Sequence, residues 1–88
     1  MALKKKWEVE VDGARHVVEL RNSFWLALLI YVDGTLVHRA RGIPLVPVVG
    51  DFAFAIGSQQ AMLRVRDLRT FVDYTLSVNG ELVGEYQR

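Results

Sequence analysis

Three short turns carry the side chains that come closest to a ligand-binding pattern. Each places an acidic or amide residue before a glycine: Asp12-Gly13, Asp33-Gly34 and Asn79-Gly80. Their oxygens could bind calcium or a sugar hydroxyl, but calcium takes about six to eight oxygen ligands and one carboxylate per turn supplies too few. An Asx-Gly pair is also what a two-residue hairpin loop requires, because both of its central residues adopt positive φ. We therefore interpret these residues as turn formers.

The two histidines, His16 and His38, are the remaining candidates for metal binding or general-base chemistry. His16 falls on the apolar side of its predicted hairpin, where a histidine is more often packed and hydrogen-bonded than catalytic, and His38 has a similar setting. The chain has no cysteine, so a zinc site would need both histidines and distant carboxylates. We predict no metal and no cofactor.

Nucleophilic and phosphate-binding motifs are missing from the sequence. The serines at positions 23, 58 and 77 lie in no Gly-x-Ser-x-Gly motif, and there is no glycine-rich phosphate loop and no His-Glu-x-x-His. We expect a protein that is not an enzyme.

Four arginines form a candidate basic patch in the middle of the chain: Arg39, Arg41, Arg64 and Arg66. If the strands that hold Arg39 and Arg64 were neighbours, these side chains would offer part of a strip for phosphate or for an acidic partner. The alternative is an ordinary solvated surface. Few aromatic residues lie between them, so nucleic acid is not favoured.

Composition indicates one globular domain over residues 1–88. Hydrophobic residues make up 51% of the chain, and 11 basic residues against 10 acidic ones give a net charge of +1, which specifies no partner class. The longest apolar run, residues 24–32, is far shorter than the roughly 20 residues of a membrane helix. The N-terminal lysines lead into an alternating stretch rather than a signal peptide. We expect a cytoplasmic protein without membrane spans.

Alternation of apolar and polar residues with a period of two predicts β-strands throughout the chain. The hairpin at Asp12-Gly13 has a well-defined register, because charged side chains then face opposite charges on one side of the ladder, Glu10 with Arg15 and Lys6 with Glu19. The other face collects apolar residues and His16, namely Trp7, Val9, Val11, Ala14, His16 and Val18.

The hairpin at Asp33-Gly34 differs because its strands are apolar on both faces. A two-residue loop pairs Val32 with Thr35, Tyr31 with Leu36, Ile30 with Val37 and Leu29 with His38. Such strands are either covered on both sides or form an interface. The predicted registers leave several apolar side chains off the main core face, and we take them as a candidate protein interface: Tyr31, Leu36, Leu82 and Tyr86.

Shorter elements fill the middle of the chain. Residues 42–49 contain two prolines, which predict an edge strand or an extended connection. Strands are expected over 52–56 and 61–66, with a turn over 57–60. About eight short strands at this spacing predict an all-β fold, a small antiparallel β-sandwich, with a partly open β-barrel as the alternative.

The order of these pieces resembles one repeat of the Fas apoptotic inhibitory molecule family. The resemblance rests on the stretches Trp7-x-Val9-x-Val11-Asp12-Gly13, Ile30-Tyr31-Val32-Asp33-Gly34, Phe52-x-Phe54-x-Ile56-Gly57 and Tyr74-x-Leu76-x-Val78-Asn79-Gly80. It implies a β-sandwich without a catalytic site or cofactor that acts through protein contacts. Because that family looks like two tandem repeats, it also implies that two chains could pair.

Two functions are therefore expected. The first is a non-enzymatic β-sandwich module that binds another protein or itself. The alternative is a small-ligand or carbohydrate-binding sandwich that uses aromatic side chains such as Trp25.

Overall fold

A computed structural model of the chain describes residues 2–23, 27–42, 48–69 and 71–87. These residues form strands and tight turns, and none of their segments is a helix that could span a membrane. The strands are β1 (Ala2–Val11), β2 (Ala14–Ser23), β3 (Ala27–Val32), β4 (Thr35–Arg41), β5 (Gly50–Ile56), β6 (Gln59–Asp67), β7 (Val72–Val78) and β8 (Glu81–Gln87).

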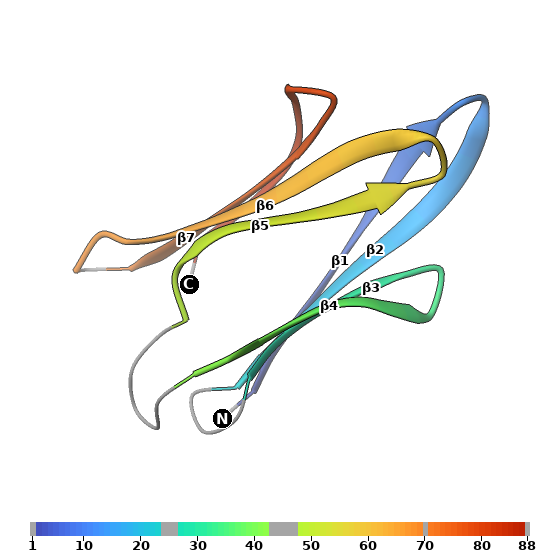
Figure 1. Cartoon of the computed structure of the whole chain (residues 1–88). Coiled ribbons are helices and arrows are strands. Elements are labelled where there is room, and N and C mark those ends of the chain that lie inside the picture. The colour runs from blue at the N-terminus through green and yellow to red at the C-terminus, as the bar shows by residue number, and fades with distance from the viewer. Residues whose placement is uncertain (1, 24–26, 43–47, 70, 88) are drawn as a thin grey trace.

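The strands build two antiparallel four-stranded sheets, one from β1 to β4 and one from β5 to β8, each in simple chain order. The sheets face each other and are not closed into a barrel (Figure 1). The all-β sandwich is confirmed, and the partly open barrel is not formed. Side chains bridge the two seams between the sheets, with the His38 and Phe52 rings 5.2 Å apart at β4 and β5.

The predicted turns have the expected backbone. Asp12, Asp33 and Asn79 have φ of 53°, 51° and 53°, and the glycine after each is also at positive φ. This is the geometry of a type I′ turn. The hairpin of β5 and β6 turns at Gly57 and Ser58 alone. The turn predicted over 57–60 was therefore too long, because Gln59 and Gln60 already belong to β6.

The register of the first hairpin is confirmed from Lys6 paired with Glu19 to Val11 paired with Ala14, and it continues unchanged to Ala2 paired with Ser23. Lys6 and Glu19 lie 3.7 Å apart, as expected. Glu10 is opposite Arg15 along the backbone, but the Arg15 guanidinium instead approaches Glu8, the next outward residue of β1, at 3.7 Å.

The register of the second hairpin was wrong beyond its first two pairs. Tyr31 faces Leu36 as predicted, but Ile30 then faces His38 and Leu29 faces Arg39, so Val37 is an extra residue in β4. The β-bulge brings His38 and Ala40 to the inner face. A period-two pattern cannot detect such an insertion where both faces carry apolar residues.

The last hairpin repeats this arrangement. Ser77 faces Leu82 and Leu76 faces Gly84, which makes Val83 the extra residue in β8. In both sheets the first turn residue also donates a backbone hydrogen bond to the second strand of that sheet, Asp33 N to Val17 O at 2.8 Å and Asn79 N to Gln60 O at 2.7 Å. The two sheets are therefore built to one plan, beyond the repeated turn visible in the sequence.

The core lies between the sheets and consists of alternate residues of most strands. The largest fully buried side chains come from both sheets: Tyr74, Leu20, Leu28, Ile30, Ile56, Leu63, Leu76, Val18 and Val65. One polar residue, Asn22, is buried among them at 3% exposure. At the seam of β1 and β8, the Trp7 indole donates to the backbone oxygen of Glu85 at 3.4 Å.

Candidate functional site

The two bulges determine which apolar side chains reach solvent. Without a bulge, Val37 would point into the core opposite Ile30. With it, the adjacent pairs Leu36-Val37 in β4 and Leu82-Val83 in β8 are all exposed, at 46%, 38%, 55% and 41%. Both strands stand at the outside of a sheet, where backbone N–H and C=O groups point away from the ladder.

The four residues of the predicted interface do not form one surface. Leu36 extends outward from the first sheet and Leu82 from the second, on opposite sides of the sandwich. Tyr31 is half-buried beside Leu36, with the Arg21 guanidinium 4.8 Å from the centre of its ring. The structure thus brings together Tyr31 with Leu36 and places Leu82 elsewhere.

Tyr86 was wrongly assigned to the outer face. The bulge at Val83 reverses the order of inward and outward residues in the rest of β8, so Tyr86 pairs with Tyr74 and packs against the core. The two rings are 6.1 Å apart, and the Lys5 ammonium lies 5.4 Å from the Tyr86 ring across the seam.

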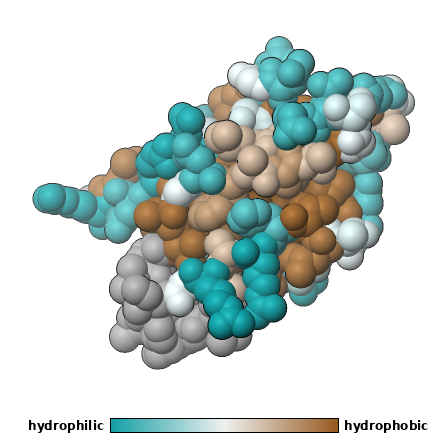
Figure 2. All heavy atoms as spheres, in the orientation of Figure 1, coloured by the Kyte–Doolittle hydropathy of each residue, from teal (hydrophilic) through white to brown (hydrophobic). Residues whose placement is uncertain are grey.

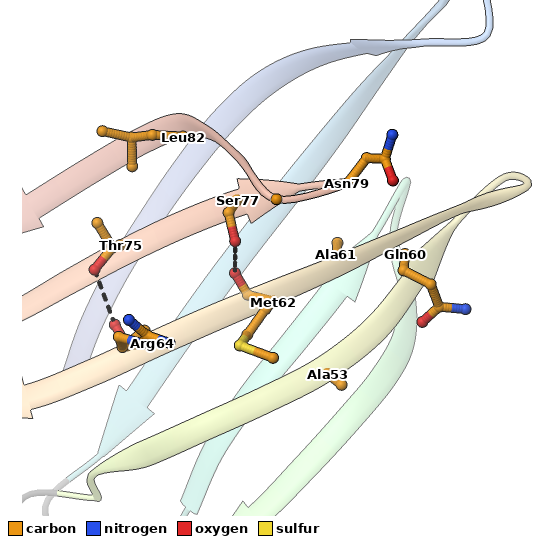
Figure 3. A pocket seen from close by; sticks show the side chains of 10 residues that line it. Ala53, Gln60, Ala61, Met62, Arg64, Thr75, Ser77, Asn79 and Leu82 are labelled. Carbon is orange, nitrogen blue, oxygen red and sulfur yellow. Dashed lines mark hydrogen bonds between the residues drawn. The ribbon is translucent and has the colours of Figure 1, made fainter.

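A groove of about 540 Å³ crosses the outer face of the second sheet (Figure 3). Its floor follows one row of the ladder, from Ala53 through Met62 and Ser77 to Leu82. The small side chains of Ala53 and Ser77 leave the space. The face turned to the viewer in Figure 2 shows hydrophobic atoms over β5, with hydrophilic residues around them.

Polar groups border this groove. Ser77 Oγ donates to Met62 O at 3.4 Å and Thr75 Oγ1 donates to Arg64 O at 3.5 Å, so both hydroxyls are directed at the neighbouring strand. Arg64 stands at one side, next to Thr75 in the ladder. The arrangement combines an apolar floor with a cation at its margin.

The predicted basic patch is divided between the two outer faces. Arg39 and Arg41 extend from β4 on the first sheet, whereas Arg64 and Arg66 extend from β6 on the second, and these strands are not neighbours. Arg66 and Arg64 share one carboxylate, with nitrogen–oxygen distances to Asp51 Oδ1 of 2.9 and 3.3 Å. The two guanidinium groups hold the pKa of Asp51 below its usual value, and the hydrogen bond from Arg66 is the largest cause.

Two of the turn residues also tie strands together. Asp33 accepts from the Val17 amide at 2.9 Å and from His16 Nδ1 at 2.6 Å, and these two hydrogen bonds lower the pKa of Asp33. The hydrogen bond of His16 was predicted, but its acceptor was not.

Asp12 links the tips of the two sheets. It accepts from the Ser58 hydroxyl and from Gln59 Nε2, the latter at 3.4 Å, and the Ser58 hydrogen bond is the main cause of its lowered pKa. Within the part of the chain that the structure describes, no group of three His, Asp or Glu side chains could hold a metal ion.

The carbohydrate hypothesis used Trp25, which lies outside the described residues. Residues 43–47, which include both prolines of the predicted edge strand or connection, also lie outside them. Sequence reasoning also missed the exposure of Val37 and Val83. The signal was present, because Leu-Val follows the Asp33-Gly34 and Asn79-Gly80 turns after one further residue.

Fold and surface define a small antiparallel β-sandwich of hairpins, with exposed Leu-Val pairs on the edge strands β4 and β8 and a shallow groove. The family model described as Fas apoptotic inhibitory molecule matches residues 3–88, and the chain belongs to that family. No curated protein matches the chain.

Proposed function

We propose that this chain is a non-enzymatic, cytoplasmic protein-interaction module that binds another protein, or a second copy of itself, through its edge strands. The observation that carries the proposal is the exposure of two apolar pairs, Leu36-Val37 and Leu82-Val83, on strands with an open hydrogen-bonding side. Strand addition uses both features, because main-chain hydrogen bonds supply affinity and side-chain contacts supply specificity.

The polar side chains support an interaction role rather than catalysis. Asp12, Asp33 and His16 hold turns and strands together, and Arg64 and Arg66 are paired with Asp51. Each of these groups forms a hydrogen bond or an ion pair within the fold. The exposed leucines have none.

Affinity capture with matched variants tests this proposal. Leu36→Arg and Leu82→Arg place a charge on the proposed contact strands, whereas Leu68→Arg makes the same change at a leucine that is 49% exposed in the β6–β7 connection. We expect specific proteins, quantified by mass spectrometry, to be retained by the native chain and by Leu68→Arg and lost from one of the other two. Identical sets from all four chains would overturn the proposal.

The groove favours a second candidate function, the binding of a small ligand. Its volume of about 540 Å³ falls within the roughly 300 to 1,000 Å³ of typical ligand sites. An apolar floor with Arg64 at one side suits a ligand with an apolar body and an anionic or hydroxyl group. Thermal shifts across a sugar and metabolite panel should appear in the native chain and disappear in Ala53→Phe, which fills the floor. A panel without any shift would remove this candidate.

A further inference from the structure

The first strand has an open edge that is long and regular. β1 covers ten residues, and β2 is its hydrogen-bonded neighbour among the described strands (Figure 1, blue). Its register against β2 runs without a shift, and it contains neither proline nor glycine. Bulges, prolines and short length protect many edges from pairing, and β1 has none of these, so its lysines are the protection it carries.

Hydrogen-bond alternation identifies the backbone groups that point outward. Residues next to a two-residue loop form a hydrogen-bonded pair, and such pairs alternate with non-bonded ones along the ladder. Val11, Val9 and Trp7 therefore bond to β2. The N–H and C=O groups of the residues between them, Glu10, Glu8, Lys6 and Lys4, face away from the sheet.

The other strands agree with this assignment. Val17, which pairs with Glu8, turns its carbonyl to β3, where it accepts from Asp33 N at 2.8 Å. No backbone hydrogen bond joins β1 to β8 among the described residues. The contact between them is made by an inward side chain, the Trp7 indole on Glu85 O.

The same four residues carry a charge pattern that is complementary to itself. Two lysines precede Trp7 and two glutamates follow it, and all four side chains are exposed: Lys4, Lys6, Glu8 and Glu10. In an antiparallel pair of β1 strands centred on Trp7, Lys6 meets Glu8 of the second copy and Lys4 meets Glu10. Every outward backbone group and every outward charge then finds a partner at once.

Other registers are disfavoured by the same charges. A slip by two residues places Lys6 against Lys6 or Glu8 against Glu8 of the second copy, although two Lys–Glu pairs remain in each case. In-register parallel pairing opposes like charges at all four positions. Like charges directly across a ladder are destabilising. The pattern therefore favours the antiparallel orientation and the register centred on Trp7, in which none of the four charges meets a like charge.

In the monomer, ion pairs involve only the inner two of these four charged residues. Lys6 pairs with Glu19 and Glu8 with Arg15, each at 3.7 Å. Lys4 and Glu10 have no ion-pair partner within the described residues, and Lys4 faces Arg21, a like charge, across the β1–β2 ladder.

We propose that two copies of this chain associate by antiparallel pairing of β1 with β1 about a two-fold axis at Trp7. The first sheets of the two copies become one continuous sheet, and the interface is isologous, as is usual for homodimers. This inference rests on the proposed function and deepens it, because it names a second copy as one partner and β1 as the contact.

A charge exchange tests the proposal by sedimentation velocity and equilibrium. We expect the native chain to dimerise and the dissociation constant to rise by about tenfold or more in Lys4→Glu and in Glu10→Lys, because each homodimer then contains two like-charge pairs. An equimolar mixture of the two variants should regain native affinity, since its pairs are again opposite. Arg39→Glu reverses a charge on exposed β4, at the opposite edge of the first sheet, and should leave the dissociation constant unaltered.

The variants also separate association from folding. Glu10→Lys changes an exposed side chain without an ion-pair partner among the described residues, so its monomer should melt close to the native one while its dimer weakens. A native chain that stays monomeric up to about 1 mM, or a dimer that both variants leave unchanged, would overturn the inference. In that case the capture experiment on Leu36 and Leu82 would still decide the proposed function.

Discussion

Asn22 of β2 and Tyr74 of β7 are joined across the interior by a hydrogen bond, in which Asn22 Nδ2 donates to the Tyr74 hydroxyl at 2.9 Å. The two residues are 52 positions apart and belong to different sheets. Both side chains are buried, and Asn22 Oδ1 accepts no hydrogen bond from the residues that the structure describes. The bond therefore fixes how one sheet sits on the other.

Removal of the Tyr74 hydroxyl should destabilise the fold. Tyr74→Phe leaves the Asn22 amide buried without this acceptor, and we expect the free energy of unfolding to fall by about 1 to 3 kcal/mol in urea denaturation. Tyr31→Phe removes a hydroxyl from a half-buried outer position and should change it by less than about 0.5 kcal/mol. The double variant Asn22→Leu with Tyr74→Phe should regain part of the loss, and equal losses in both tyrosine variants would contradict this role.

Gly84 should resist enlargement because it lies against Trp7. A Cβ atom at this position would approach Trp7 Cδ1 to 2.6 Å and Nε1 to 2.8 Å. Gly84→Ala should therefore lower the free energy of unfolding by about 1 to 3 kcal/mol, since the packed indole must move. Val83→Ala, one residue away and exposed, should cost less than about 0.5 kcal/mol. Thermal melts of both variants compare the two, and a neutral Gly84→Ala would show that the indole has room to shift.

Acid should weaken the fold partly through Asp33. The Val17 amide and, secondly, His16 lower the pKa of this carboxyl below its ordinary value of 3.8. A group with a lowered folded pKa contributes stability above the ordinary value, and this contribution is lost as the pH falls through the folded pKa. Asp33→Asn keeps a turn former and an acceptor but does not titrate.

The native chain should therefore exceed Asp33→Asn in melting temperature at neutral pH, and the gap should close as the pH falls below about 4. Glu10→Gln removes an exposed carboxylate that accepts no hydrogen bond from the described side chains, and serves as the control. A gap for Asp33→Asn that is constant from neutral to acid pH would show that the charge of Asp33 does not contribute.

The hairpins could be predicted from local sequence patterns, whereas the contacts between hairpins could not. Asx-Gly turns and the opposed charges of β1 and β2 specify pairing between strands that are adjacent in the chain, so the register from Lys6 to Glu19 followed from the sequence. The Asn22 hydrogen bond and the Asp12 contact to Ser58 depend on how two sheets pack, which alternation does not encode. The two bulges could not be predicted, because strands with apolar residues on both faces keep a similar hydrophobic pattern when the register shifts by one residue.

The bulge in β8 makes a clear prediction about two nearby residues. An unbulged strand would place Tyr86 outside, whereas the structure packs it against the core and leaves Leu82 at 55% exposure. Tyr86→Ala should therefore lower the free energy of unfolding by at least about 1 kcal/mol more than Leu82→Ala, because only the first removes buried apolar contacts. Urea denaturation of both variants, with Leu36→Ala as the equivalent of Leu82→Ala in the first sheet, measures the difference. If Tyr86→Ala cost no more than Leu82→Ala, Tyr86 would lie on the outer face, as it would in a β8 strand without the bulge.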